Sequence, residues 1–199
     1  MPEIPDPLKS ETLTVGLLPI GPIPKAALDR LAPRIRDLLG VETHILGPMK
    51  KPEGAYDERR DQYDAAAILA ALEASRFDAC HKILGLLNVD LFIPIFTHVL
   101  GEAREGGTCA LASLYRLRRN PDGSTPRMEC ILERLEKVAV HELGHTFNLG
   151  HCPDETCLMH FSGDLNDLDD LDPGFCKYCA AYLEEARRTR LKKRTPLDE

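Results

Sequence analysis

Short apolar runs alternate with stretches of helical spacing through the first half of the chain. Residues 24–39 repeat apolar positions about every 3.6 residues and stop at Gly40, so we expect a helix that faces a core and is bent by Pro33. An alanine-rich stretch from about 61 to 75 predicts a second helix after an exposed loop at 47–60. Three short runs are typical of buried strands: 12–18, 41–46 and 82–87.

Two further strands are expected after the third apolar run. They cover residues 97–103 and 108–116 and are separated by the turn signal Glu105-Gly106-Gly107. Strands that alternate with helices predict a mostly parallel or mixed sheet with helices packed on it. The sequence therefore indicates an α+β protein whose first part resembles an α/β layer.

The second half begins with one long helix, expected at residues 129–147 because its apolar residues share one side. From Gly150 onward we find no strand pattern, and an acidic stretch at 164–172 precedes a last helix. Asp172 followed by Pro173 predicts the start of that helix. We divide the chain into a larger subdomain (1–149) and a small C-terminal one (150–199), which together form one domain.

Composition narrows the class of protein. The chain has 199 residues, of which 43% are hydrophobic, which suits one domain with a real core. A net charge of −7 argues against nucleic acid as a partner. The apolar run around 83–96 is too interrupted to span a membrane, and the N-terminus does not resemble a secretory leader. With an odd number of cysteines, seven, these features predict a soluble monomer in the reducing cytoplasm.

The long helix carries the sequence His141-Glu142-Leu143-Gly144-His145. Histidines four residues apart lie on one helix face and can reach one ion, and Glu142 can hold a water molecule beside them. This pentapeptide alone also fits a solvated helix face. His151 follows six residues later, however, and three imidazoles with an open fourth position are the ligand set of a catalytic zinc.

The chain must turn sharply between His145 and His151. Such a turn favours a residue that tolerates a positive φ, and either Asn148 or Gly150 meets this need.

Four of the cysteines form two close pairs, Cys152 with Cys157 and Cys176 with Cys179, with 18 residues between the pairs. This spacing indicates a closed, structural four-thiolate zinc site, and two disulfides are the alternative. The remaining three are interpreted as small core residues: Cys80, Cys109 and Cys130.

Taken together, the pattern of residues 141–179 resembles the signature of the archaemetzincins, a family of metzincin-clan zinc peptidases. It comprises the three histidines, Glu142, Asn148, the four cysteines and Met159, which lies two residues after Cys157. The run from Leu91 to Ala103 adds weaker support. One departure is Asn148, where metzincins usually carry glycine. The resemblance implies a zincin fold in which a twisted, mixed five-stranded sheet, a backing helix and an active-site helix lie above a small zinc-stabilised subdomain.

The resemblance also implies roles for particular residues. Met159 would lie in the turn beneath the metal, and the strand near 97–103 would be the sheet edge that pairs with an extended peptide. We therefore expect two zinc ions per chain, one catalytic and one structural, and a peptide or protein substrate. Glu142 would act as the general base and then as the acid in peptide-bond hydrolysis.

Three further features bear on function. His160 is a candidate for stabilising the oxyanion, although it follows Met159 directly and a surface role is the alternative. The acidic stretch fits a solvated turn with helix caps better than a calcium loop. A rival function is a zinc-bearing module with little or no catalysis that binds nucleic acid or an acidic partner. It would use a basic C-terminal segment: Arg187, Arg188, Arg190, Lys192, Lys193 and Arg194.

Overall fold

The structure, a computed structural model, describes residues 12–75 and 77–192. The helices are α1 (Lys25–Leu39), α2 (Ala65–Ala74), α3 (Met128–Thr146), α4 (Leu165–Asp170) and α5 (Lys177–Lys192), with short 3₁₀ turns at Glu53–Ala55 and Arg116–Arg118. The strands are β1 (Thr14–Pro19), β2 (Glu42–Ile45), β3 (Tyr56–Asp57), β4 (Gln62–Asp64), β5 (Lys82–Leu87), β6 (Leu91–Ile93), β7 (Phe96–Val99), β8 (Gly101–Ala103) and β9 (Cys109–Ser113).

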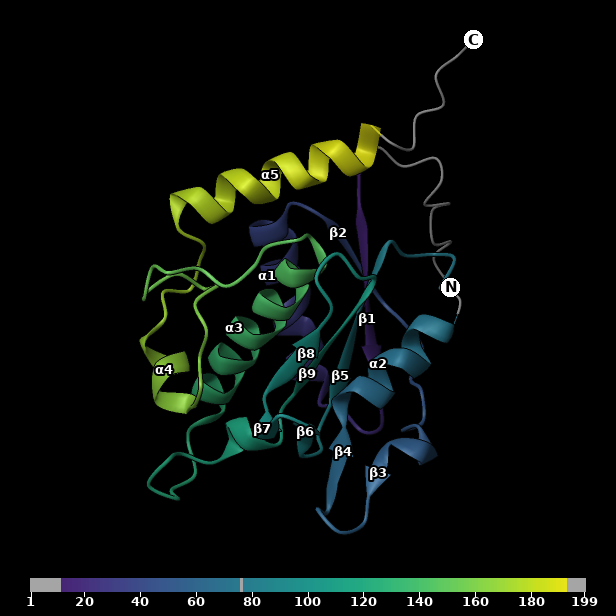
Figure 1. Cartoon of the computed structure of the whole chain (residues 1–199), viewed down its shortest axis with the longest axis vertical. Coiled ribbons are helices and arrows are strands. Elements are labelled where there is room, and N and C mark those ends of the chain that lie inside the picture. Colours follow the sequence, from purple (N-terminus) through teal and green to yellow (C-terminus); the bar gives the residue numbers. More distant parts are fainter. Residues whose placement is uncertain (1–11, 76, 193–199) are drawn as a thin grey trace.

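A mixed five-stranded sheet forms the centre of the molecule, in the order β2-β1-β5-β9-β8 (Figure 1). The first four strands are parallel, and β8 runs antiparallel to β9 at the edge. This confirms the predicted mixed sheet.

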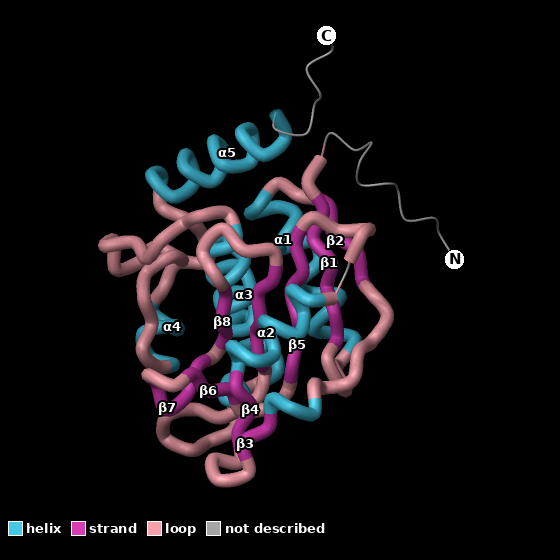
Figure 2. Tube along the Cα trace, turned by 45° about the vertical axis from the view of Figure 1, so that its right-hand side comes forward, coloured by secondary structure: helices cyan, strands magenta, loops and turns pink. Residues whose placement is uncertain are grey.

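Helices cover both faces of this sheet (Figure 2). On β5, Leu84 and Leu86 pack in the core formed with α1 and α3, whereas Ile83 and Leu87 pack in the core formed with α2. Because strands covered on both faces cannot expose side chains, every residue of β1, β5 and β9 is buried. α1 and α3 also pack against each other, as a backing helix and a helix that carries the histidines.

Capping residues set the end of α1 and the start of α2. Gly40, with a φ of 58°, closes α1 in the left-handed conformation, as expected. The side chain of Asp64 accepts hydrogen bonds from the backbone N–H groups of Ala66 and Ala67, so α2 begins at Ala65. The prediction of a helix from about residue 61 was therefore wrong at its start, where Gln62–Asp64 forms β4.

The predicted strand at 97–103 is two strands. β7 belongs to a second, four-stranded sheet in the order β3-β4-β6-β7, and only β8 joins the central sheet. At Leu100 the chain leaves the second sheet and enters the central one. The alternation of apolar and polar residues cannot reveal this break, because both strands are extended. The second sheet was not anticipated, since its strands span only two to four residues.

The described residues after 150 contain no strand, as predicted. Asp164 caps α4 by accepting from the N–H groups of Asn166 and Asp167. The expected helix start at Asp172 was wrong, because α5 begins at Lys177. The preceding segment is instead held by backbone bonds, from Asp172 N to Thr156 O (2.7 Å) and from Leu158 N to Gly174 O (3.0 Å).

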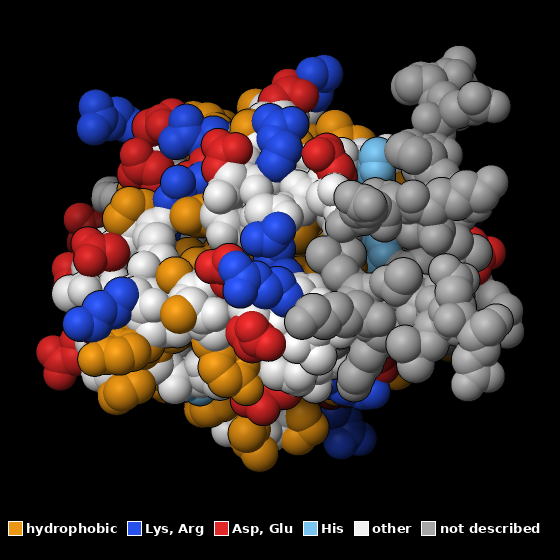
Figure 3. All heavy atoms as spheres, turned by 90° about the horizontal axis from the view of Figure 1, so that it is seen from above, with side chains coloured by type: hydrophobic (Ala, Val, Ile, Leu, Met, Phe, Trp, Pro, Cys, Tyr) orange, Lys and Arg blue, Asp and Glu red, His pale blue; other side chains and the backbone are white. Residues whose placement is uncertain are grey.

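The surface around α5 is mixed in charge. Seen from above, acidic and basic side chains are interspersed on the face that α5 crosses (Figure 3). None of the described helices is long and apolar enough to cross a membrane.

Candidate metal centre

Three histidines converge beside the last turns of α3. The metal-binding nitrogen atoms of His141, His145 and His151 all lie within 4.8 Å of one another. His141 and His145 come from one face of the helix, and the turn after the helix brings His151 to them. The structure thus brings together the predicted histidine cluster.

Backbone carbonyls fix the orientation of two of these rings. Nδ1 of His141 donates to Leu158 O at 2.8 Å, and Nδ1 of His145 donates to Leu149 O at 2.7 Å. A neutral imidazole carries only one proton, so both Nε2 atoms present lone pairs, 3.1 Å apart. Two lone pairs at this distance need a cation between them, and this donor set therefore fits zinc.

The electrostatic surroundings keep the imidazoles neutral. Burial, together with the neighbouring His145, lowers the pKa of His141 to about 3. Burial likewise lowers the pKa of His145 and His151. Neutral rings are the form that binds a metal.

Glu142 lies beside the cluster, against the edge strand. A Cβ on Gly101 would come within 2.6 Å of Glu142 Cγ and of Leu111 O, so only glycine leaves room there. Burial, and secondarily the Glu102 carboxylate, raises the pKa of Glu142 well above its ordinary value. A carboxyl with a raised pKa is suited to holding a proton during a reaction.

The turn between the second and third histidines uses asparagine. Asn148 has a φ of 66°, whereas Gly150 lies outside the left-handed region. Asn148 N donates to His145 O at 2.9 Å. Gly106, in the loop between β8 and β9, donates from its own N–H to the same carbonyl at 2.9 Å, which ties that loop to the end of α3.

Met159 is fully buried and packs against Gly144 of α3. A Cβ on Gly144 would lie 2.5 Å from its Sδ atom, so the sulfur occupies space left by that glycine. The carbonyl of Met159 accepts a hydrogen bond from Cys152 N at 2.8 Å, which links the backbone at Met159 to the cysteine cluster.

His160 is turned toward the backbone of the same turn. Its Nδ1 donates to Cys152 O at 2.9 Å, and the residue is half-buried. It is not among the residues that line the cleft at the histidines.

That cleft has a volume of about 400 Å³, within the range of ligand-binding sites. Phe161 packs edge-on against His151, with ring centroids 5.2 Å apart, and lies 6.1 Å from Phe96 on β7. Glu102 and Glu105 also line it. Sequence reasoning did not name Phe96, Glu105 or Phe161 as cleft residues, whereas Glu102 lies in the strand at 97–103 that was expected to border the substrate.

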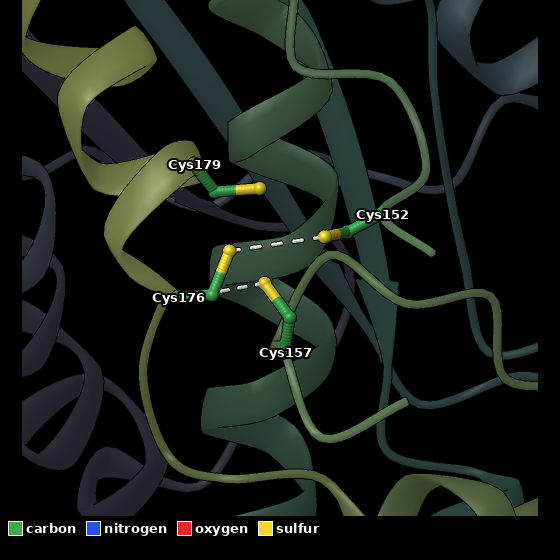
Figure 4. Close-up of side chains that lie close together, drawn as sticks. All are labelled: Cys152, Cys157, Cys176 and Cys179. Atoms are coloured by element: carbon green, nitrogen blue, oxygen red, sulfur yellow. Dashed lines mark hydrogen bonds between the residues drawn. The ribbon is translucent and has the colours of Figure 1, made fainter. Parts of the chain in front are cut away.

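The four predicted cysteines form a second cluster. Their sulfur atoms lie within 4.8 Å of one another and point inward from two loops and the start of α5 (Figure 4). Cys176 N donates to Cys157 Sγ at 3.3 Å, and Met159 N donates to the same atom at 3.5 Å. Backbone donors stabilise a thiolate, so this donor set fits a closed tetrahedral zinc site.

The other three cysteines lie outside this cluster. Cys109 is buried as expected, whereas Cys80 and Cys130 are half-buried. The acidic stretch forms no metal-binding group in the described part of the chain. Instead, Asp169 makes a two-bond ion pair with the buried Arg134 of α3, at 2.7 and 2.5 Å.

Known proteins are similar to this chain in sequence and in fold. Residues 27–185 match the family described as Peptidase family M54. The archaemetzincin of Methanopyrus kandleri is 38% identical over 163 residues, 82% of this chain and 89% of the relative. That of Pyrococcus furiosus is 37% identical over 175 residues, 85% of this chain and 91% of the relative.

Solved structures agree. The crystal structure of archaemetzincin from Methanopyrus kandleri has a TM-score of 0.81 and 36% identity, covering 90% of this chain and 98% of that one. Archaemetzincin from Archaeoglobus fulgidus, complexed with malonate, has a TM-score of 0.74 and 29% identity, covering 85% and 99%.

The mixed sheet and the paired metal-binding clusters, with these matches, define a zinc-dependent metallopeptidase. The chain belongs to peptidase family M54, the archaemetzincins.

Proposed function

We propose that this peptidase cleaves peptide bonds with a water molecule activated by Glu142, beside a catalytic zinc held by His141, His145 and His151. The convergence of the three ring nitrogen atoms within 4.8 Å carries the proposal. They face an open cleft that Glu142 also lines, so a substrate and a water molecule can reach both.

Zinc held by these three histidines would supply a Lewis acid for the scissile carbonyl and would lower the pKa of the water. The Glu142 carboxylate accepts a proton from the water molecule while the water oxygen forms a bond to the carbonyl carbon. Glu142 then delivers this proton to the nitrogen, and the carbon–nitrogen bond breaks. The products are a carboxylic acid and an amine. His160, which bonds to Cys152 O, keeps its proposed oxyanion role only if its ring turns toward the cleft.

Backbone groups of the edge strand would hold the peptide. β8 pairs with β9 on one side only, and Gly101, Glu102 and Ala103 line the cleft. An extended peptide can add to such an edge as a further strand.

The second zinc would be structural. Cys152, Cys157, Cys176 and Cys179 complete a tetrahedral set without an open position. The proposal is therefore two zinc ions per chain, with residues 1–149 and 150–199 as two subdomains of one monomeric metzincin. Four free thiols close together suit the reducing cytoplasm.

The alternative of a binding module gains little from the C-terminal helix. Arg188 pairs with Glu184, and the Arg187 guanidinium packs on Gly40 at the end of α1. The side chains of the other four basic residues lie outside the described residues. Acidic side chains are also interspersed on this face (Figure 3).

The test is cleavage of a mixed peptide library by the purified protein. We expect cleavage that stops with a zinc chelator and returns when zinc is added back. Zinc-loaded protein that leaves the library intact, yet binds nucleic acid with a steep salt dependence, would contradict the proposal and favour the binding module.

A further inference from the structure

A second groove, of about 790 Å³, continues from the catalytic cleft. We call it the distal groove. His98 and Leu100 line both spaces. Gly163 lines the cleft, and the next residues, Asp164 and Leu165, line the distal groove. A chain that leaves the cleft along these walls therefore enters the distal groove.

The position of the groove along α3 sets its distance from the scissile bond. Ile131 lines the groove and precedes His141 by ten residues on the same helix. Ten helical residues span about 15 Å. An extended peptide covers about 3.3 Å per residue, so the part of the groove that Ile131 lines lies about four residues from the metal-binding histidines.

Strand direction tells which end of the peptide arrives there. The distal groove lies beyond the first residue of β8, because His98 and Leu100 precede Gly101. Antiparallel pairing is the commoner arrangement at a sheet edge. A peptide antiparallel to β8 places its C-terminal part beyond Gly101, in the distal groove.

The charges that line the groove are unbalanced. Arg116 is neutralised by Asp90, with bonds of 2.6 and 2.7 Å. Asp164 is engaged as the cap of α4. Arg118 and Arg119 are exposed, and neither forms an ion pair with any residue that the structure describes. Burial lowers the pKa of His98, which leaves that ring neutral.

Apolar surface accompanies these two cations. Tyr115 and Met128 line the groove and are 52% and 57% exposed, which is high for such side chains. The groove thus offers contact area for a peptide together with two free guanidinium groups that bind carboxylates well.

We propose that the distal groove binds the C-terminal part of the peptide substrate, and that Arg118 and Arg119 select a carboxylate about four residues after the scissile bond. The inference rests on the proposed function. The carboxylate belongs either to an acidic side chain or to the peptide's own C-terminus.

Matched peptides test this selection. They share one cleaved core and carry Glu, Gln or Lys at the fourth residue after the scissile bond, each with a free or an amidated C-terminus placed beyond it. We expect kcat/KM to be about 1.5- to 5-fold higher for Glu than for Gln, as for exposed ion pairs, and lower again for Lys. A second pair of peptides ends at this position, one with a free C-terminal carboxylate and one amidated, and faster cleavage of the free acid identifies the terminal carboxylate as the group bound.

The double variant Arg118→Gln/Arg119→Gln should lose this discrimination and cleave the Glu, Gln and Lys peptides at similar rates. Arg36→Gln/Arg59→Gln removes the same charge from exposed positions outside the groove and should keep the discrimination. Equal rates for the three peptides, discrimination that survives in the Arg118/Arg119 variant, or a preference for acid four residues before the scissile bond would overturn the inference. In each case cleavage of the Gln peptide leaves the proposed function intact. Failure to cleave any peptide would contradict both.

Discussion

At the scale of single residues, Gly144 is explained by its contact with Met159. Glycine inside a helix costs about 1 kcal/mol relative to alanine, yet Gly144 lies inside α3. The Met159 sulfur fills the space where a Cβ would be. We therefore expect Gly144→Ala to lower the free energy of unfolding by about 1–3 kcal/mol, despite its better helix propensity.

A double-mutant cycle checks this contact. In a Met159→Ala background the space is vacant, so adding Gly144→Ala should cost nothing or stabilise the helix slightly. Urea unfolding of the four proteins measures both steps. Equal costs of Gly144→Ala in the two backgrounds would show that Met159 is not the cause.

Asn148 gives a second prediction at this scale. Its φ of 66° suits glycine as well as asparagine. Asn148→Gly should change the free energy of unfolding by less than about 1 kcal/mol, whereas Asn148→Val should lower it by about 1–2 kcal/mol, because a branched side chain resists the left-handed conformation. Urea unfolding again provides the measurement, and a Val variant as stable as wild type would refute the role of the turn.

Residues of the site were predictable where they are close in sequence. His141, His145 and Asn148 lie in one helix and the turn that follows, so spacing alone fixes their relative positions. Phe96 and Glu105 reach the same cleft from the loop-rich edge of the sheet. Their arrival depends on tertiary packing between distant segments, which no local pattern encodes.

At the scale of elements, the cysteine cluster joins the start of α5 to the two loops that follow α3. A structural zinc site contributes its binding free energy to folding, about 10–16 kcal/mol in isolated zinc fingers. Cys176→Ser should therefore lower the free energy of unfolding by at least about 3 kcal/mol and reduce the zinc content from two ions to one. Thermal unfolding and metal analysis of the purified variant measure both.

Cys130→Ser is the matched control, since Cys130 is half-buried and belongs to neither cluster. It should keep both zinc ions and nearly the wild-type melting temperature. A Cys176→Ser protein that keeps two zinc ions and full stability would contradict a structural role for the cluster.

Helices and strands with a long apolar pattern were predicted well, and strands of two to four residues were not. β5 matches its predicted range, and α1 and α3 differ by one residue at each end or less. The division of 97–103 into β7 and β8 was hidden because both strands are extended. The start of α5 was misplaced because tertiary bonds to Thr156 and Leu158 override the local signal at Asp172 and Pro173.

At the scale of the whole molecule, one core serves both parts of the chain. Leu158, Leu168 and Leu183 belong to the same cluster of buried side chains as α1 and α3. The change in sequence pattern near residue 149 therefore marks a change in chemistry, while packing continues across it. This continuity holds His151 and Met159 against α3, where the first two histidines lie.

The central claim is that Glu142 performs the proton transfers while the three histidines hold the metal. Glu142→Gln tests it most directly, with cleavage rate and zinc content measured on the same sample and Glu133→Gln, on the exposed side of α3, as the control. We predict two zinc ions per chain in wild type and in both variants, and a fall in kcat of about 10²–10⁴-fold for Glu142→Gln alone. A Glu142→Gln protein that holds two zinc ions and cleaves at the wild-type rate would contradict the account.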